Sequence, residues 1–152
     1  MVYLTLYINN KHGGLVYVKD FLAPTNLTSN ERIILASTFH GMCGVASQVS
    51  PLRKPHGWKP GSGNFAGLLE PNSLTCIETA DFVLHAYETP TGVRFFATAS
   101  LGEVKVGEFL RAASSVYSDL ILKNPFFEED MPIRSPEFDK ALQETCSRII
   151  MK

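Results

Sequence analysis

Two pairs of cysteine and histidine residues have a spacing at which their side chains could act together. His40 and Cys43 lie three positions apart in a segment whose apolar pattern predicts a helix, so they could offer two metal ligands on one face. A zinc site needs two further ligands, and the sequence has no second pair nearby. We therefore expect neither a metal site nor a bound cofactor.

The second pair is Cys76 and His85, which fall on neighbouring predicted strands, so contact between them is an open question. A thiol nucleophile needs a basic histidine and an orienting carboxylate or amide. The alternation of the strand equally allows His85 to face solvent, and this half-buried strand pair is the reading we favour. Without a convincing acid, base or nucleophile set, we expect a protein that is not an enzyme by itself.

Two features of the segment after the first predicted helix could bind a ligand or a surface. The glycines between Gly61 and Gly67 faintly resemble a phosphate-binding loop, but no strand precedes them and no Gly-Lys-Ser/Thr ending follows. The basic cluster from Arg53 to Lys59, with Trp58 inside it, could touch acidic lipid head groups or an acidic protein. The default for such a cluster is a solvated loop.

Length and composition favour a single packed domain. The chain has 152 residues, of which 45% are hydrophobic, and a net charge of -1, so no global field favours nucleic acid. We expect one domain over 1–152, with a loop at about 51–72. Three cysteines without a CxxC spacing and no apparent secretion signal indicate a reducing cytosol. No apolar run approaches the roughly 20 residues that span a bilayer, so membrane contact is expected to be peripheral at most.

Five segments alternate as strands do. Residues 2–9 and 15–21 flank a turn cluster and predict a β-hairpin, and the first of them is apolar on both faces, as in the middle of a covered sheet. Residues 73–79, 81–88 and 93–99 predict three consecutive antiparallel strands. Together they predict one five-stranded sheet.

The first predicted helix begins with a capping box between Thr28 and Glu31 and runs to about Val49, before Pro51. Its apolar stripe is unusually wide and contains Leu35, Phe39, Met42, Ala46 and Val49, with Ile33, Ile34 and Val45 beside them. Gly41 and Gly44 within this helix indicate close packing or mere tolerance. An arc wider than one sheet can cover favours a partner protein as a second burial surface.

Two more helices follow the last strand. One begins at about Lys105, buries positions from Val106 to Leu120, and ends at Asn124-Pro125. Ser135 as cap and Pro136 as first helical residue open the other. Its apolar face is expected to contain Phe138, Leu142, Thr145 or Cys146, and Ile149. The order β-β-α-β-β-β-α-α predicts an α+β fold with helices on both faces of the sheet.

The segment 123–134 joins the last two helices and reads KNPFFEEDMPIR. Two prolines stiffen it, and four apolar side chains surround its acidic triplet. Apolar anchors beside charges on a stiff loop suit a protein interface. The alternative is that the phenylalanines tuck into the core.

Four stretches of the chain are distinctive as wholes: YINNKHGGLVY, LTSNERIILASTFHGMCGVASQVSP, ETADFVLHAYETPTGVRF and YSDLILKNPFFEEDMPIR. They resemble the synbindin branch of the small TRAPP (trafficking protein particle) subunits. The likeness covers nearly the whole chain apart from Gly57 to Pro71. It implies a longin or SNARE-like fold, with one helix on one face of the sheet and two on the other. Animal synbindins carry a PDZ-like insertion between the second strand and first helix, where this chain has only Phe21 to Leu27.

The resemblance implies a non-catalytic scaffold subunit of the TRAPP tethering complex, at endoplasmic reticulum and Golgi membranes. It would pair with a paralogous longin-like subunit and contribute to a composite surface that promotes nucleotide exchange on a Rab GTPase. Such a surface acts by binding the nucleotide-free GTPase more tightly than the nucleotide-loaded one. The alternative is a longin-like module of another trafficking assembly, such as an adaptor small subunit or a SNARE-type regulatory domain. The expected partner contacts are Leu35, Phe39, Met42, Ala46, Asn124, Pro125, Phe126, Phe127, Met131, Pro132, Ile133 and Arg134.

Overall fold

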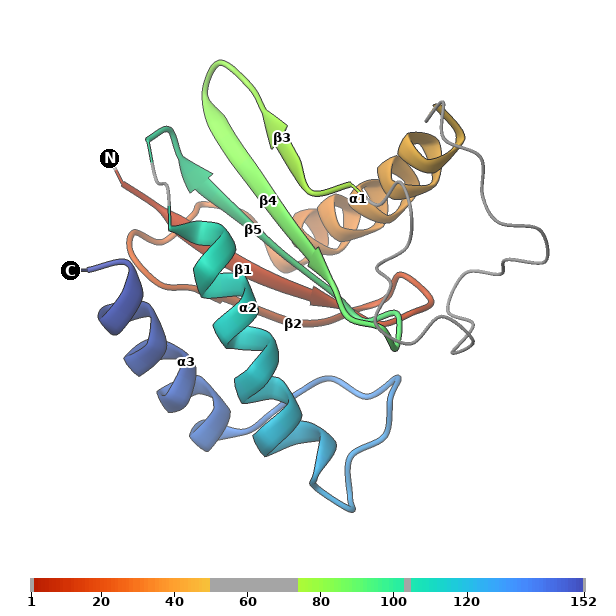
Figure 1. The fold of residues 1–152 in the computed structure, drawn as a ribbon, viewed down its shortest axis with the longest axis vertical. Coiled ribbons are helices and arrows are strands. Elements are labelled where there is room, and N and C mark those ends of the chain that lie inside the picture. The colour runs from red at the N-terminus through yellow and green to blue at the C-terminus, as the bar shows by residue number, and fades with distance from the viewer. Residues whose placement is uncertain (1, 50–73, 103–104, 152) are drawn as a thin grey trace.

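Five strands form one antiparallel sheet in the computed structural model, in the order β2-β1-β5-β4-β3 (Figure 1). The structure describes residues 2–49, 74–102 and 105–151. The strands are β1 (Leu4–Asn9), β2 (Leu15–Asp20), β3 (Cys76–Glu78), β4 (Phe82–Glu88) and β5 (Arg94–Ser100). The hairpin and the three-strand meander predicted from the sequence are confirmed, although β3 is shorter than its alternating pattern.

β1 is covered on both faces, as its apolar pattern predicts. It lies between β2 and β5, and all six of its residues are buried. β1 pairs with β5, so the first and the last strand of the sequence lie next to each other in the middle of the sheet. β2 is left as the outermost strand on one side of the described sheet.

The first helix, α1 (Ser29–Val49), has the predicted bounds and the predicted start. The backbone N–H of Thr28 donates to Glu31 Oε2 (2.7 Å), and the backbone N–H of Glu31 donates to Thr28 Oγ1 (3.3 Å). This reciprocal pair satisfies two backbone donors that the first helical turn leaves without partners.

The last two helices are α2 (Val106–Tyr117) and α3 (Pro136–Ile149). α2 continues into a π-helical turn, η2 (Ser118–Leu122), where the apolar spacing predicted an uninterrupted helix. The apolar spacing alone does not distinguish a final α turn from a wider π turn. α3 begins as predicted, because Ser135 Oγ accepts the backbone N–H of Phe138 at 3.3 Å and Pro136 follows it.

The helices cover the two faces of the sheet unequally, as expected (Figure 1). α2 and α3 lie side by side over one face, and their buried residues join a core that includes Leu6, Phe95 and Phe138. α1 lies over the other face on a smaller cluster built around Phe39 and Phe96. Among the described helices, none is both long and apolar enough to cross a membrane.

Candidate functional site: protein-interaction surfaces

The inward face of α1 is formed by Ala36, Phe39 and Cys43. The ring of Phe39 stacks on that of Phe96, with centroids 4.1 Å apart, and Asn9 Nδ2 donates to the backbone carbonyl of Ala36 (3.1 Å). Phe39 is only 1% exposed. The expectation that Phe39 is a partner contact is therefore corrected: its ring holds the helix on the sheet, and we leave it out of the interaction surface.

The outer face of α1 carries a row of apolar side chains that nothing in the described chain covers. Ile34, Met42, Val45 and Val49 are 58%, 37%, 59% and 76% exposed. Leu35 and Ala46 are half-buried at the border of this face, and a Cβ added at Gly41 or Gly44 would meet none of the described atoms within 4 Å. We call the side chains of Ile34, Met42, Val45 and Val49 the outer face of α1.

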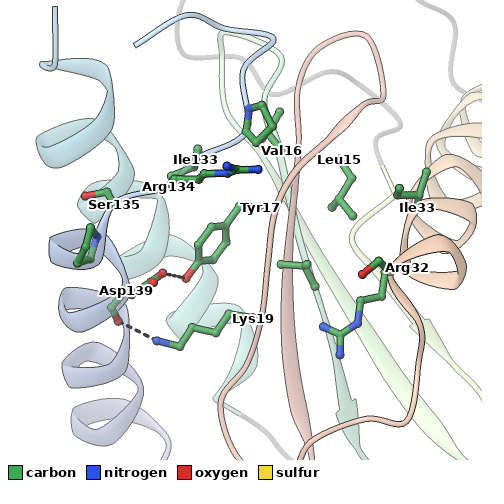
Figure 2. A pocket seen from close by; sticks show the side chains of 14 residues that line it. Leu15, Val16, Tyr17, Lys19, Arg32, Ile33, Ile133, Arg134, Ser135 and Asp139 are labelled. Carbon is green, nitrogen blue, oxygen red and sulfur yellow. Dashed lines mark hydrogen bonds between the residues drawn. The ribbon is translucent and has the colours of Figure 1, made fainter. Parts of the chain in front are cut away.

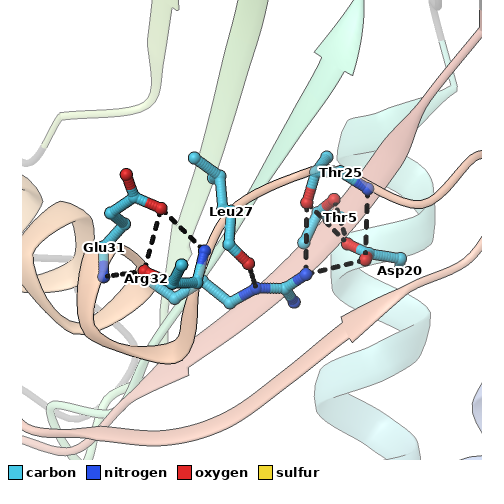
Figure 3. Close-up of polar contacts among 7 residues, drawn as sticks. Thr5, Asp20, Thr25, Leu27, Glu31 and Arg32 are labelled. Carbon is cyan, nitrogen blue, oxygen red and sulfur yellow. Dashed lines mark hydrogen bonds and ion pairs between the residues drawn. The ribbon is translucent and has the colours of Figure 1, made fainter.

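The start of α1 is fastened to β2 by a polar cluster around Asp20 (Figure 3). Arg32 Nη2 lies 2.8 Å from Asp20 Oδ2, and the hydroxyl of Thr5 donates to Asp20 Oδ1 at 2.6 Å. Burial opposes ionisation of Asp20, but the Thr5 hydroxyl and the Arg32 guanidinium outweigh it and hold the pKa of Asp20 below its ordinary value. Arg32 and Asp20 together fix the direction in which α1 leaves the sheet.

The connection between η2 and α3, residues 123–135, divides its apolar side chains between core and solvent. Phe126 is 85% exposed and Met131 is 45% exposed. Phe127 is half-buried with its ring 6.3 Å from that of Tyr117, and Ile133 is buried. Ile133 is buried in the core, which corrects its assignment as a partner contact. Phe127 packs against the core with part of its ring exposed, and Phe126 and Met131 face solvent, so for these three the expected partner contact stays a prediction.

The other expected contacts of the connection lie at the surface. Asn124, Pro125, Pro132 and Arg134 are exposed. Two side chains of the acidic triplet bond to the β1–β2 turn: Lys11 Nζ lies 3.1 Å from Glu129 Oε2, and Asn10 Nδ2 donates to Asp130 Oδ1 at 2.9 Å. Sequence reasoning missed Asn10 and Lys11, because no local pattern links the β1–β2 turn to a segment that follows it by more than a hundred residues.

The cysteine and histidine on the two neighbouring strands lie opposite each other, since the backbone of Cys76 pairs with that of His85 between β3 and β4. Burial, with a smaller contribution from the Glu78 carboxylate, raises the pKa of Cys76 above its ordinary value. A catalytic thiol requires the opposite shift. The pair is consistent with the half-buried strand pair that we favoured.

His40 is engaged by an arginine. Arg94 Nη1 lies 2.9 Å from His40 Nδ1, and burial together with this cation lowers the pKa of His40. In the described part of the chain, no group of three or more His, Cys, Asp or Glu side chains could hold a metal ion. The basic cluster from Arg53 to Lys59 and the glycines from Gly61 to Gly67 lie outside the described residues.

The amino-acid sequence is similar to a protein family model and to several named proteins. The model of the Sybindin-like family matches residues 3–149 of this chain. The chain is similar to "Trafficking protein particle complex subunit 4" of Dictyostelium discoideum, with 36% identity over 138 residues that cover 91% of each chain. It is also similar to the proteins of that name from Homo sapiens and Mus musculus, at 37% and 36% identity over 117 residues. These matches cover 77% of this chain and 46% of the mammalian proteins, so the chain spans about half of their length.

Proposed function

Because the chain belongs to the Sybindin-like family, we propose that it is a subunit of the trafficking protein particle complex and acts there as a scaffold. In this proposal it pairs with a paralogous longin-like subunit, and the pair supplies part of a composite surface that promotes nucleotide exchange on a Rab GTPase. The assembly would act in transport between the endoplasmic reticulum and the Golgi. The support is the identity to relatives named as subunits of that complex, together with the surfaces described above.

The outer face of α1 is the observation that carries the proposal. Four exposed apolar side chains lie on one helix whose opposite side contacts the sheet through Phe39 and Arg32. An exposed apolar patch on a helix that is already folded is suited to bind a partner protein. Binding removes apolar area from water, and each Å² contributes about 25 cal/mol to the free energy of association.

The connection 123–135 supports a second contact. Phe126 is almost fully exposed, while its neighbour Phe127 and the turn residue Lys11 hold the segment in place. Exposed aromatic rings on preorganised loops are typical anchors of protein interfaces. Asn124 Oδ1 accepts the backbone N–H of Phe126 at 3.0 Å, which orients this part of the turn.

Nucleotide exchange of this kind needs no acid, base or nucleophile on this chain. A surface that binds the nucleotide-free GTPase more tightly than the loaded one lowers the affinity for nucleotide by the same factor.

The proposal is tested by charge substitution on the outer face of α1. The variant Val45→Asp should fold normally, because Val45 is 59% exposed, but it should lower co-purification with the paralogous longin-like subunits at least tenfold. Release of labelled GDP from the Rab GTPase by the reconstituted complex should fall in parallel. Ser37→Asp is the matched control, since Ser37 is an exposed residue of the same helix outside the outer face.

The connection is tested separately with Phe126→Asp, whose control is Lys123→Asp, an exposed change in the same connection. Loss of exchange without loss of assembly would assign Phe126 to the GTPase side, and loss of assembly would assign it to a subunit contact. If Val45→Asp and Phe126→Asp both assemble and support exchange as the unmodified chain does, the proposed surfaces are wrong.

A further inference from the structure

A groove of about 840 Å³ runs along the outermost strand, β2, between the start of α1 and the start of α3 (Figure 2). β2 forms its floor from Leu15 to Lys19. One wall contains Arg32 and Ile33 of α1, and the other contains residues 132–136 and Asp139. The groove is separate from the outer face of α1, which points away from the sheet.

The backbone of β2 turns hydrogen-bonding groups into this groove. In an antiparallel pair, alternate residues bond to the neighbouring strand, and the residues between them point their N–H and C=O groups away from it. The N–H of Phe21 bonds to the carbonyl of Leu4 (2.8 Å), one step beyond the pairing of Asp20 with Thr5. Asp20 and Val18 therefore belong to the outward set, and no strand of the described chain lies beyond them.

The chain itself already uses one outward group of this edge. The backbone N–H of Ile133 donates to the carbonyl of Val16 at 2.8 Å. Ile133 belongs to the connection between η2 and α3, so this edge already bonds to the backbone of a second segment of the chain. This bond uses the carbonyl of Val16, the first residue of β2 whose backbone groups point outward. Val18 is the next such residue along the strand.

The charges around the groove are predominantly positive. The charge of Arg32 is balanced by Asp20, which lies 2.8 Å away. The other charged side chains that line the groove are the two cations Lys19 and Arg134 and the single carboxylate of Asp139. Asp139 Oδ1 already accepts the hydroxyl of Tyr17 at 2.6 Å, and Lys19 Nζ donates to the backbone carbonyl of Asp139 at 3.2 Å. Figure 2 shows the guanidinium groups of Arg134 and Arg32 reaching toward β2 from opposite walls.

We propose that this groove binds an extended, acidic segment of a partner protein, which adds as a further strand alongside β2 at Val18. Main-chain hydrogen bonds to the edge supply the affinity, as in other cases of strand addition. Acidic side chains at alternate positions face Arg134 and Lys19, and the side chains between them face Ile33. The added segment also covers the outward edge of β2, which is one of the ways in which proteins protect outermost strands.

The test uses the isolated chain and a short fluorescein-labelled peptide of alternating valine and glutamate, measured by fluorescence anisotropy. The same peptide with lysine in place of glutamate is the ligand control. We expect the glutamate peptide to bind at least tenfold more tightly, and we expect hydrogen exchange at the amides of Val18 and Asp20 to slow when it is bound. Equal binding of the two peptides, or protection at the outer face of α1 instead, would overturn the proposal.

Two variants sharpen the result. Val18→Pro removes an outward N–H without removing a bond to β1, and Pro is tolerated at such positions of edge strands; it should abolish binding. Arg134→Glu reverses the charge of an exposed side chain and should weaken binding of the glutamate peptide about fivefold, which corresponds to about 1 kcal/mol. Arg111→Glu, an exposed change on α2 outside the groove, should leave binding unchanged.

A concentration-dependent dimer that Val18→Pro abolishes would assign the edge to a second copy of this chain and would also overturn the proposal. Because the isolated chain is used, failure of this test leaves the proposed assembly through α1 unaffected. Conversely, Val45→Asp should not change binding of the glutamate peptide, since Val45 does not line the groove.

Discussion

Phe39 of α1 stacks on Phe96 of β5 with ring centroids 4.1 Å apart and planes 25° apart. Both rings are at most 1% exposed, and Tyr7 stacks on the same Phe96 ring at 4.7 Å. The helix that carries the proposed interface is therefore attached to the sheet through a stack of three aromatic rings.

Replacing Phe39 with alanine should lower the free energy of unfolding by about 3 to 5 kcal/mol, because a large cavity opens beneath α1. Chemical denaturation followed by circular dichroism measures the change. Ile34→Ala, on the opposite side of the helix, is the control and should change stability by less than about 1 kcal/mol. Equal effects of the two substitutions would contradict the assignment of the inward face.

Gly13 allows the β1–β2 turn to approach α1. Its φ is +87°, and an added Cβ would lie 2.6 Å from Cγ of His40. Gly13→Ala should therefore lose about 1 to 2 kcal/mol for the left-handed backbone and a further 1 to 3 kcal/mol for the clash. Gly102 has a φ of +93° with nothing within 4 Å of its added Cβ among the described atoms, so Gly102→Ala measures the backbone cost alone. Thermal unfolding of the two variants separates the two costs.

The cluster around Asp20 should make stability fall in acid. Because the pKa of Asp20 is lower in the folded chain than its ordinary value of 3.8, the unfolded chain binds the proton more readily. The contribution of Asp20 is therefore complete well above pH 3.8, and it is lost as the pH falls below that value toward the folded pKa. Asp20→Asn should cost about 1 to 3 kcal/mol at neutral pH and should flatten the acid limb of the stability profile. Asp81→Asn, an exposed change outside this cluster, is the matched control for removal of a carboxylate.

Phe126 and Phe127 are adjacent but should respond differently to substitution. Phe127→Ala should lower stability by about 1 to 3 kcal/mol, since its half-buried ring packs beside Tyr117. Phe126→Ala should change it by less than about 0.5 kcal/mol, because the side chain is 85% exposed. Urea unfolding of the pair checks the prediction, and a reversed order would show that the two rings exchange places in solution.

Cys76 should behave as an unactivated thiol. Burial and the Glu78 carboxylate raise its pKa, so alkylation by iodoacetamide at pH 7 should be slower than that of a cysteine in an unstructured peptide. The rate should increase about tenfold per pH unit up to the pKa. Mass spectrometry gives the rate at Cys76 separately from the buried Cys43 and Cys146. If His85→Ala slowed the reaction markedly at pH 7, a thiolate activated by His85 would have to be reconsidered.

Much of the fold follows from local sequence. The capping box of Thr28 and Glu31, the Ser135 cap and the alternation of β1 each involve residues a few positions apart, and the structure confirms all of them. Short-range hydrogen bonds and periodic apolar positions are decided by neighbours in the chain, so they can be read without the tertiary structure. The likeness to the synbindin branch also follows from the sequence, and the family match confirms it.

The candidate site depended on contacts that no local pattern contains. α1 is apolar around much of its circumference, so its periodicity did not reveal that Phe39 faces the sheet while Val45 faces solvent. In the connection after η2, adjacent phenylalanines are equally apolar, and only the position of Tyr117 decides that Phe127 packs and Phe126 does not. Apolar spacing specifies which residues share a face, but the rotation of that face toward the core is decided by long-range packing.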